Sequence, residues 1–182
     1  MKFAPLVVNM LLAWFQGEPL NDNNMKHKIY YLSSFGLLTL DQLSKQVVAS
    51  TFSLGESLSV TSFFSWSYVQ NSGAAFSLLA DSGNNQRYFL LSVSLIASLA
   101  LIVWMCKTAP TLRQRLLGQS ILLAGAIGNL IDRALYGSVI DFIDLHYGGF
   151  YWPVFNLADS FILIGVALLL FEGKHANASS EL

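Results

Sequence analysis

Four long apolar segments constrain the fold of this chain more than any other feature of its sequence. They cover residues 29–48, 88–106, 116–135 and 155–171. A helix needs roughly 20 apolar residues to cross about 30 Å of hydrocarbon, and only helices or closed barrels pair every backbone polar group in lipid. Of the 182 residues, 54% are hydrophobic and 12% are charged, a composition too apolar for an ordinary soluble domain. We therefore predict an all-α membrane protein with four transmembrane helices in a bundle.

Basic residues predict how this bundle is oriented. The connections 51–86 and 136–154 carry no lysine or arginine. Cytoplasmic loops of membrane proteins are enriched in these residues, so both connections are expected to face outward and both termini to face the cytoplasm. The basic residues that flank the segments on the side of the termini are Lys26, Lys28, Lys107, Arg113, Arg115 and Lys174.

The ends of the chain are expected to lie outside this bundle. Residues 1–24 contain about a dozen apolar residues, too few to span a bilayer. This extension is interpreted either as residues upstream of the native start at Met25 or as an interfacial or signal-like segment. The four-span domain is predicted over residues 25–172, followed by a cytoplasmic tail over residues 173–182.

The first outer connection, residues 51–87, is predicted to contain a small β-sheet. Phe64, Trp66 and Tyr68 alternate with serines, and a period of two is typical of a strand with one apolar face. Residues 71–73, Asn-Ser-Gly, indicate a turn. The alternative is an amphipathic loop anchored to the membrane surface by its aromatic residues.

Several kinds of function are disfavoured by what the sequence contains. The net charge of −1, with no basic run, predicts no nucleic-acid partner. The single cysteine, Cys106, excludes an internal disulfide and a cysteine-based metal cluster. No His-Glu-Xaa-Xaa-His zinc motif and no Gly-Xaa-Ser-Gly or Gly-Xaa-Gly-Asp peptidase motif occurs. We predict neither a metal nor a cofactor.

Some carboxylates in or beside the apolar segments are assigned to structure. Asp41 and Lys45 are four residues apart, so they share a helix face and are expected to form an ion pair. Asp132, next to Arg133, is interpreted as part of an internal pair or a helix cap. We expect these residues to support the fold.

Asp141 and Asp159 differ because both are flanked by apolar residues and neither has a lysine or arginine within helical reach. Two carboxylates brought together in a partly desolvated place share one proton, and such a pair suits the acid and base roles of an aspartic peptidase. Asn71, Asn129 and Asn156 are expected at the same outer boundary, where amides orient a carboxylate or a peptide backbone. Asn156 also suits a helix cap.

Two other functions are compatible with paired carboxylates. A small proton-coupled transporter uses intramembrane acids as a proton relay, although a relay spreads its acids through the bilayer depth, whereas Asp132, Asp141 and Asp159 are predicted at one boundary. A non-catalytic membrane chaperone that binds signal peptides is the third hypothesis.

Taken together, five short stretches resemble the lipoprotein signal peptidase family, also called type II signal peptidase. The resemblance covers about residues 25–172. The stretches follow in family order: "DQLSK" at 41–45, "NSGAAF" at 71–76, "GAIGNLIDR" at 125–133, "VIDF" at 139–142 and "FNLADS" at 155–160.

The resemblance implies a bacterial inner-membrane aspartyl endopeptidase with four transmembrane helices and a small extracytoplasmic sheet. Its substrates would be prolipoproteins, cleaved on the N-terminal side of a diacylglyceryl-modified cysteine at the outer face of the membrane. Membrane lipids and the inhibitor globomycin are the other implied partners. Asp141 and Asp159 match the catalytic pair of the family, whereas Asp144 matches neither. The residues implied to bind substrate or support the pair are Asn71, Gly73, Asn129, Arg133, Asn156 and Ala158.

Overall fold

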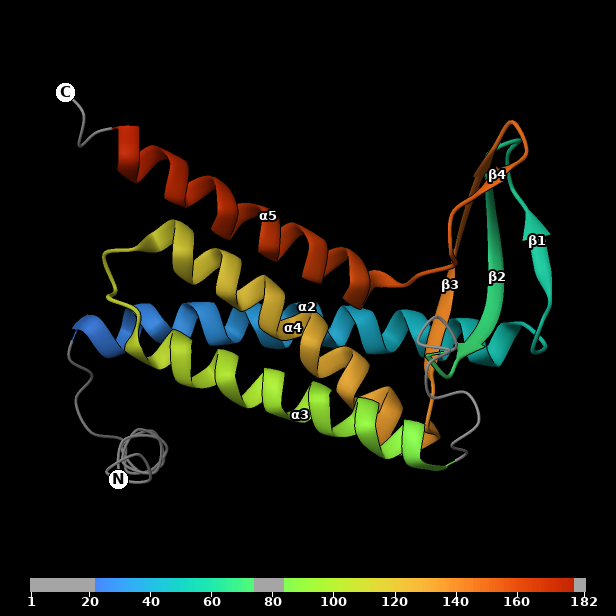
Figure 1. The fold of residues 1–182 in the computed structure, drawn as a ribbon, viewed down its shortest axis with the longest axis horizontal. Helices are drawn as coiled ribbons and strands as arrows, with labels where there is room; N and C mark the ends of the chain where they lie inside the picture. The colour runs from blue at the N-terminus through green and yellow to red at the C-terminus, as the bar shows by residue number, and fades with distance from the viewer. Residues whose placement is uncertain (1–21, 74–83, 179–182) are drawn as a thin grey trace.

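The helices of this protein lie alongside one another, with a small β-sheet at one end of them (Figure 1). A computed structural model describes residues 22–73 and 84–178, and the prediction for the N-terminal extension falls almost wholly outside them. Within the described residues the helices are α2 (Asp22–Thr51), α3 (Asn84–Lys107), α4 (Arg113–Tyr136) and α5 (Leu157–Ala178). Each predicted apolar segment therefore lies within, or almost within, one helix.

The helical content and the additional small sheet agree with the predicted fold class, whereas the number of membrane spans remains a prediction. By length and apolar composition, one stretch of the described residues, Gln86–Lys107, is suited to cross a membrane. The α2 and α4 helices carry most of the buried charged and amide side chains, which lowers their mean hydropathy: Asp41, Lys45, Gln119, Asn129 and Asp132. The polar faces of these helices thus point inward and their apolar faces point outward, the reverse of helices in a soluble protein.

Polar residues are buried inside the bundle and large apolar residues are exposed around it. Asp41, Lys45 and Asp132 are each at most 1% exposed, whereas Leu32 and Leu163 are both 72% exposed. Exposed apolar surface of this extent marks a surface that meets another apolar phase.

Small residues let α4 pack closely on its neighbours. A Cβ atom added at Gly125 would meet the backbone carbonyl of Ala158 on α5, and one added at Gly128 would meet the Asp41 carboxylate on α2. Because neither position has room for a side chain, the α4 backbone lies directly against the elements that carry the polar interior.

The sheet is antiparallel, with strand order β1-β2-β3-β4. Its strands are β1 (Ser57–Ser59), β2 (Phe64–Asn71), β3 (Val139–Tyr147) and β4 (Phe150–Tyr151). The strand predicted from alternating aromatic and serine residues is confirmed as β2. The prediction that the sheet lies between the first two helices was incomplete, because β3 and β4 come from the second outer connection. Long-range pairing of β2 with β3 cannot be read from either stretch alone.

Within residues 22–73 and 84–178, the chain passes between the helices and the sheet at three places at one end of the bundle. The α2 helix ends there, α4 leads into β3, and the segment after β4 leads into α5, while the α3–α4 connection lies at the opposite end (Figure 1). Candidate residues from distant parts of the sequence thus meet where the sheet contacts the helices.

Candidate active site

Asp141 is placed by a helix-to-strand transition. The α4 helix stops at Gly137, which adopts a left-handed conformation (φ 76°) and donates its N–H to the Arg133 carbonyl, a helix ending that favours glycine. The chain then enters β3, where pairing with β2 sets Asp141 opposite Val69. The Asp141 side chain is 2% exposed.

Asp159 is placed by the first turn of α5. The Asn156 side-chain oxygen accepts the Asp159 N–H at 2.9 Å, and the Asp159 carboxylate accepts the Asn156 N–H at 3.2 Å. This reciprocal arrangement is a capping box, so the predicted capping role of Asn156 is present. It fixes the Asp159 carboxylate at the N-terminal end of a helix, where a negative charge is stabilised by the helix dipole.

Three asparagine side chains connect the two carboxylates. Asn71 donates to Asp141 at 2.9 Å, and Asn129 donates to Asp159 at 2.7 Å. Asn156 donates to the other Asp141 oxygen at 2.6 Å and to the Asn129 side-chain oxygen at 3.3 Å. Because Asn156 contacts both aspartates, the structure brings together the two residues that the sequence analysis paired. We refer to Asp141 and Asp159 as the dyad.

The electrostatics of the dyad favour one retained proton. Burial, together with the nearby charge of Asp159, raises the pKa of Asp141 to about 6, although hydrogen bonds from Asn71 and Asn156 and the charge of Lys45 oppose the shift. A carboxyl group with this pKa keeps its proton up to a higher pH than an exposed aspartate does. The site can therefore present one acid and one base to the same reacting group.

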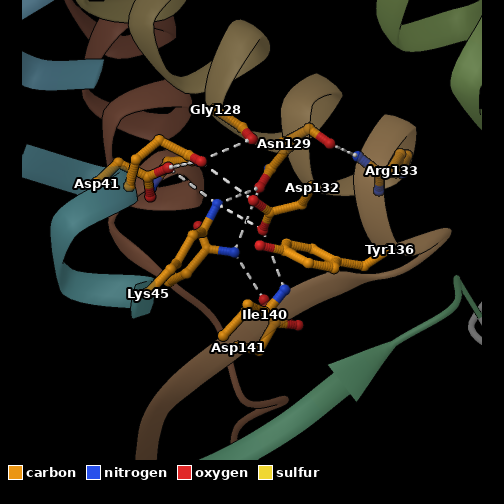
Figure 2. A network of polar contacts seen from close by, with 12 residues as sticks. Asp41, Lys45, Gly128, Asn129, Asp132, Arg133, Tyr136, Ile140 and Asp141 are labelled. Carbon is orange, nitrogen blue, oxygen red and sulfur yellow. Dashed lines mark hydrogen bonds and ion pairs between the residues drawn. The ribbon is translucent and has the colours of Figure 1, made fainter. Parts of the chain in front are cut away.

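A second buried cluster lies beside the dyad. Lys45 contacts the Asp41 carboxylate at 2.9 Å and the Asp132 carboxylate at 3.0 Å, and we call these three residues the buried triad. Lys45 also donates to the Asn129 side-chain oxygen at 3.2 Å, as Figure 2 shows. The predicted ion pair Asp41–Lys45 is thus present. The sequence suggested Arg133 as the partner of Asp132, whereas in the structure Asp132 forms its ion pair with Lys45.

Known proteins match this chain over most of its length. A family model described as signal peptidase (SPase) II matches residues 33–173. The chain belongs to the signal peptidase II family. The lipoprotein signal peptidase of Cellvibrio japonicus (strain Ueda107) is 45% identical over 143 residues, covering 79% of this chain and 84% of the relative. That of Janthinobacterium sp. (strain Marseille) is 47% identical over 138 residues, covering 75% and 82%.

A solved structure of a bacterial membrane enzyme has a similar fold. A structure titled as a bacterial membrane enzyme, obtained by the in meso method at 1.9 Å resolution, matches with a TM-score of 0.72 and 35% identity. The match covers 80% of this chain and 92% of the other. Signal peptidase II membership implies a protease, so the peptidase prediction is favoured over the transporter and the chaperone.

The remaining predicted residues of this signal peptidase II chain surround the dyad. Gly73 (φ 86°) donates its N–H to the Asn71 side-chain oxygen at 2.8 Å, which turns the Asn71 amide nitrogen toward Asp141. Ala158 is fully buried, between Asp41 and Asp159. Arg133 interacts electrostatically with both members of the dyad, and its guanidinium donates to the Asn129 carbonyl at 3.3 Å.

Gln42 was not predicted as part of the signal peptidase II site. Its amide nitrogen donates to both carboxylates of the buried triad, each at 3.1 Å, and to the Gly128 carbonyl at 3.2 Å. Its place one residue after Asp41 was the available signal, but a single glutamine in an apolar segment does not indicate its partners. Within the described residues, no group of three or more histidine, cysteine or acidic residues is arranged to hold a metal.

Proposed function

We propose that this protein is an intramembrane aspartyl endopeptidase that removes the signal peptide from diacylglyceryl-modified prolipoproteins. The observation that carries the proposal is the Asn156 side chain, which donates to Asp141 and caps the helix turn of Asp159 within a signal peptidase II fold. The curated relatives are named lipoprotein signal peptidases, which supports prolipoproteins as the substrate class.

In the proposed mechanism, Asp159 is the base and Asp141 is the acid. The Asp159 carboxylate, stabilised at the start of α5, takes a proton from water while the water oxygen attacks the scissile carbonyl carbon. Asp141 donates its proton to the carbonyl oxygen, giving a tetrahedral gem-diol. The C–N bond then breaks as the protonated Asp159 gives its proton to the leaving nitrogen, and Asp141 takes back a hydroxyl proton. The result is a carboxylic acid and a free amine, and the dyad has returned to its starting state.

The asparagines orient the dyad and the substrate in this mechanism. Asn71 and Asn129 each hold one carboxylate oxygen of the dyad, and Asn156 holds the second oxygen of each carboxylate through its side chain and its backbone N–H. Arg133 lies beside the dyad, where its positive charge stabilises the partial negative charge that develops on the carbonyl oxygen before the proton from Asp141 arrives.

Membrane insertion explains how substrate reaches this site. We place all four helices across the bacterial inner membrane, with the termini in the cytoplasm and the sheet at the outer face. Support comes from the basic residues at the end opposite the sheet and from exposed apolar side chains such as Leu32, Phe35 and Leu163. A signal-peptide helix can then lie beside the bundle while the diacylglyceryl chains of the modified cysteine stay in the lipid.

The decisive experiment replaces each member of the dyad in turn. Asp141→Asn and Asp159→Asn should each reduce cleavage of a diacylglyceryl-modified prolipoprotein by roughly 10²–10⁴-fold or more, because each removes one proton-transfer group. Turnover is measured with purified full-length protein in lipid, and folding is checked by thermal unfolding. Wild-type turnover by either variant would disprove the assignment.

Asp144→Asn is the matched control. Asp144 lies on the same strand as Asp141, but its carboxylate accepts a hydrogen bond from Ser67 and lies 3.7 Å from the His146 ring. The variant should therefore retain wild-type turnover. Globomycin should inhibit the wild type, and loss of activity with a chelator that zinc restores would contradict the metal-free mechanism.

A further inference from the structure

Two backbone hydrogen bonds connect the buried triad to the dyad. The Asp41 carboxylate accepts the N–H of Ala158, the residue before Asp159, at 2.9 Å. The Asp132 carboxylate accepts the N–H of Ile140, the residue before Asp141, at 3.1 Å. Each triad carboxylate therefore holds the backbone immediately preceding one member of the dyad.

Lys45 connects these two carboxylates to each other. Its ammonium group has three donors, and three buried acceptors lie within reach: Asp41 at 2.9 Å, Asp132 at 3.0 Å and Asn129 at 3.2 Å (Figure 2). The lysine is 1% exposed, Asp41 is 0% exposed and Asp132 is 1% exposed. Because water cannot replace any of these contacts, the position of one carboxylate fixes the position of the other.

Lys45 also fixes the orientation of the Asn129 amide. The ammonium group holds the amide oxygen, so the amide nitrogen faces Asp159. With the amide reversed, its NH₂ group would face the ammonium and its oxygen would face the carboxylate. Both contacts would be repulsive, so the reversed orientation is disfavoured.

We propose that Lys45 is a positioning residue that sets the separation and orientation of Asp141 and Asp159. It acts through Asp41 and Ala158 on α5, through Asp132 and Ile140 on β3, and through Asn129. The inference rests on the proposed function and goes beyond the structural ion pair predicted from sequence. A simple ion pair would stabilise the fold without affecting turnover by the folded molecules.

The test compares two ways of removing Lys45. Lys45→Met leaves two buried carboxylates without their cation, which destabilises the fold as well as releasing the dyad. The triple variant Asp41→Asn/Lys45→Met/Asp132→Asn leaves no buried charge unpaired, so its stability should recover toward that of the wild type. Where Lys45→Met alone fails to fold, the triple variant carries the test. The protein is purified at full length in lipid, and kcat, KM and thermal unfolding are measured with a fluorogenic diacylglyceryl-modified lipopeptide.

We expect kcat of the folded triple variant to fall about 100-fold, because a displacement of about 1 Å in a catalytic group has this effect. KM should stay within about twofold, since the triad is buried away from the substrate surface. Recovery of both stability and wild-type kcat in the triple variant would overturn the proposal. So would wild-type kcat in folded Lys45→Met.

Two controls separate this inference from the proposed function. Glu172→Gln removes a different inter-helix ion pair, Arg115–Glu172 at 2.9 Å, and should leave kcat unchanged because neither residue contacts the dyad network. Asp159→Asn gives the inactive baseline. Active triad variants alongside an inactive Asp159→Asn would overturn the inference about Lys45 alone, whereas an active Asp159→Asn would overturn the proposed function itself.

Discussion

Two clusters in this protein each contain a pair of buried or partly buried aspartates, but different groups lie between the carboxylates. In the buried triad an ammonium group contacts both Asp41 and Asp132. In the dyad, amide groups contact Asp141 and Asp159, and Asn156 bonds to both. A cation in contact with two carboxylates stabilises both in the ionised form, whereas neutral amides compensate their repulsion less. The charges of Lys45 and Arg133 act on the dyad only from nearby. The triad is therefore suited to hold elements together, and the dyad is suited to retain a proton.

The two clusters also share a residue. The Asn129 amide oxygen contacts Lys45 and its amide nitrogen contacts Asp159. The Asn129 side chain thus connects the buried triad directly to the dyad. A rigid support can thus lie beside a site whose charge changes in the proposed reaction.

The largest effect is expected when the bridge within the dyad is removed. Asn156→Ala deletes the bond to Asp141, the bond to Asn129 and the side-chain cap of α5. Since the Asp141 carboxylate loses one of its two amide donors and the turn that carries Asp159 loses its side-chain cap, kcat should fall about 100-fold, as measured by single-turnover cleavage of the lipidated substrate. If activity instead fell no further than in Asp144→Asn, the amide bridge would not distinguish the two clusters.

A cation introduced into the dyad tests the comparison directly. Asn71→Lys places an ammonium next to Asp141 and should lower the pKa of that carboxyl, which an adjacent opposite charge does by about 1–3 units. In the wild type, kcat/KM should fall as pH rises through about 6, because Asp141 then loses its proton. In Asn71→Lys this decrease should occur at lower pH. Turnover of the variant at neutral pH should therefore be about one tenth of the wild-type value or lower.

Asn71→Met is the matched variant without a charge. It removes a hydrogen bond that lowers the pKa of Asp141, so the decrease in kcat/KM should move to higher pH. The two substitutions at one position thus shift the profile in opposite directions. Identical profiles for the two variants would show that Asp141 is not the titrating acid.

The stability of the fold is expected to change with pH in the same direction as kcat/KM. The pKa of Asp141 is raised from 3.8 to about 6 on folding, so its protonated form contributes stability that is fully present below about pH 4. That contribution is lost as pH rises through about 6.

Sequence alone predicted the elements of this fold better than their connections. Long apolar segments indicated the helices, and alternation indicated β2, because both patterns are local. The pairing of β2 with β3 and the bonds from Asp41 to Ala158 and from Asp132 to Ile140 join distant positions. Such contacts depend on which faces meet after folding, and no single stretch specifies them.

The site shows the same division. Asp141 and Asp159 stood out because their neighbours are apolar and no cation lies within helical reach. Lys45 was assigned to Asp41 alone because their spacing is local, whereas its contacts with Asp132 and Asn129 depend on the packing of α2 against α4. Its sequence neighbours therefore predicted only one of the three contacts that the lysine makes.

The smallest effect concerns how closely α4 approaches the buried triad. Gly128→Ala would bring a methyl group against the Asp41 carboxylate and Ala158, and overpacking of this kind destabilises by roughly 1–3 kcal/mol.

Gly36→Ala on α2 is the matched control, because no atom lies within 4 Å of its added Cβ and alanine favours the helix by up to about 1 kcal/mol. Thermal unfolding in lipid should therefore occur at lower temperature for the first variant and at the same or higher temperature for the second. Because the Asp41 carboxylate holds the backbone N–H of Ala158, the residue before Asp159, Gly128→Ala should also lower kcat, whereas Gly36→Ala should not. Equal unfolding temperatures and equal kcat values would show that the triad tolerates displacement and that its close packing against α4 does not support the dyad.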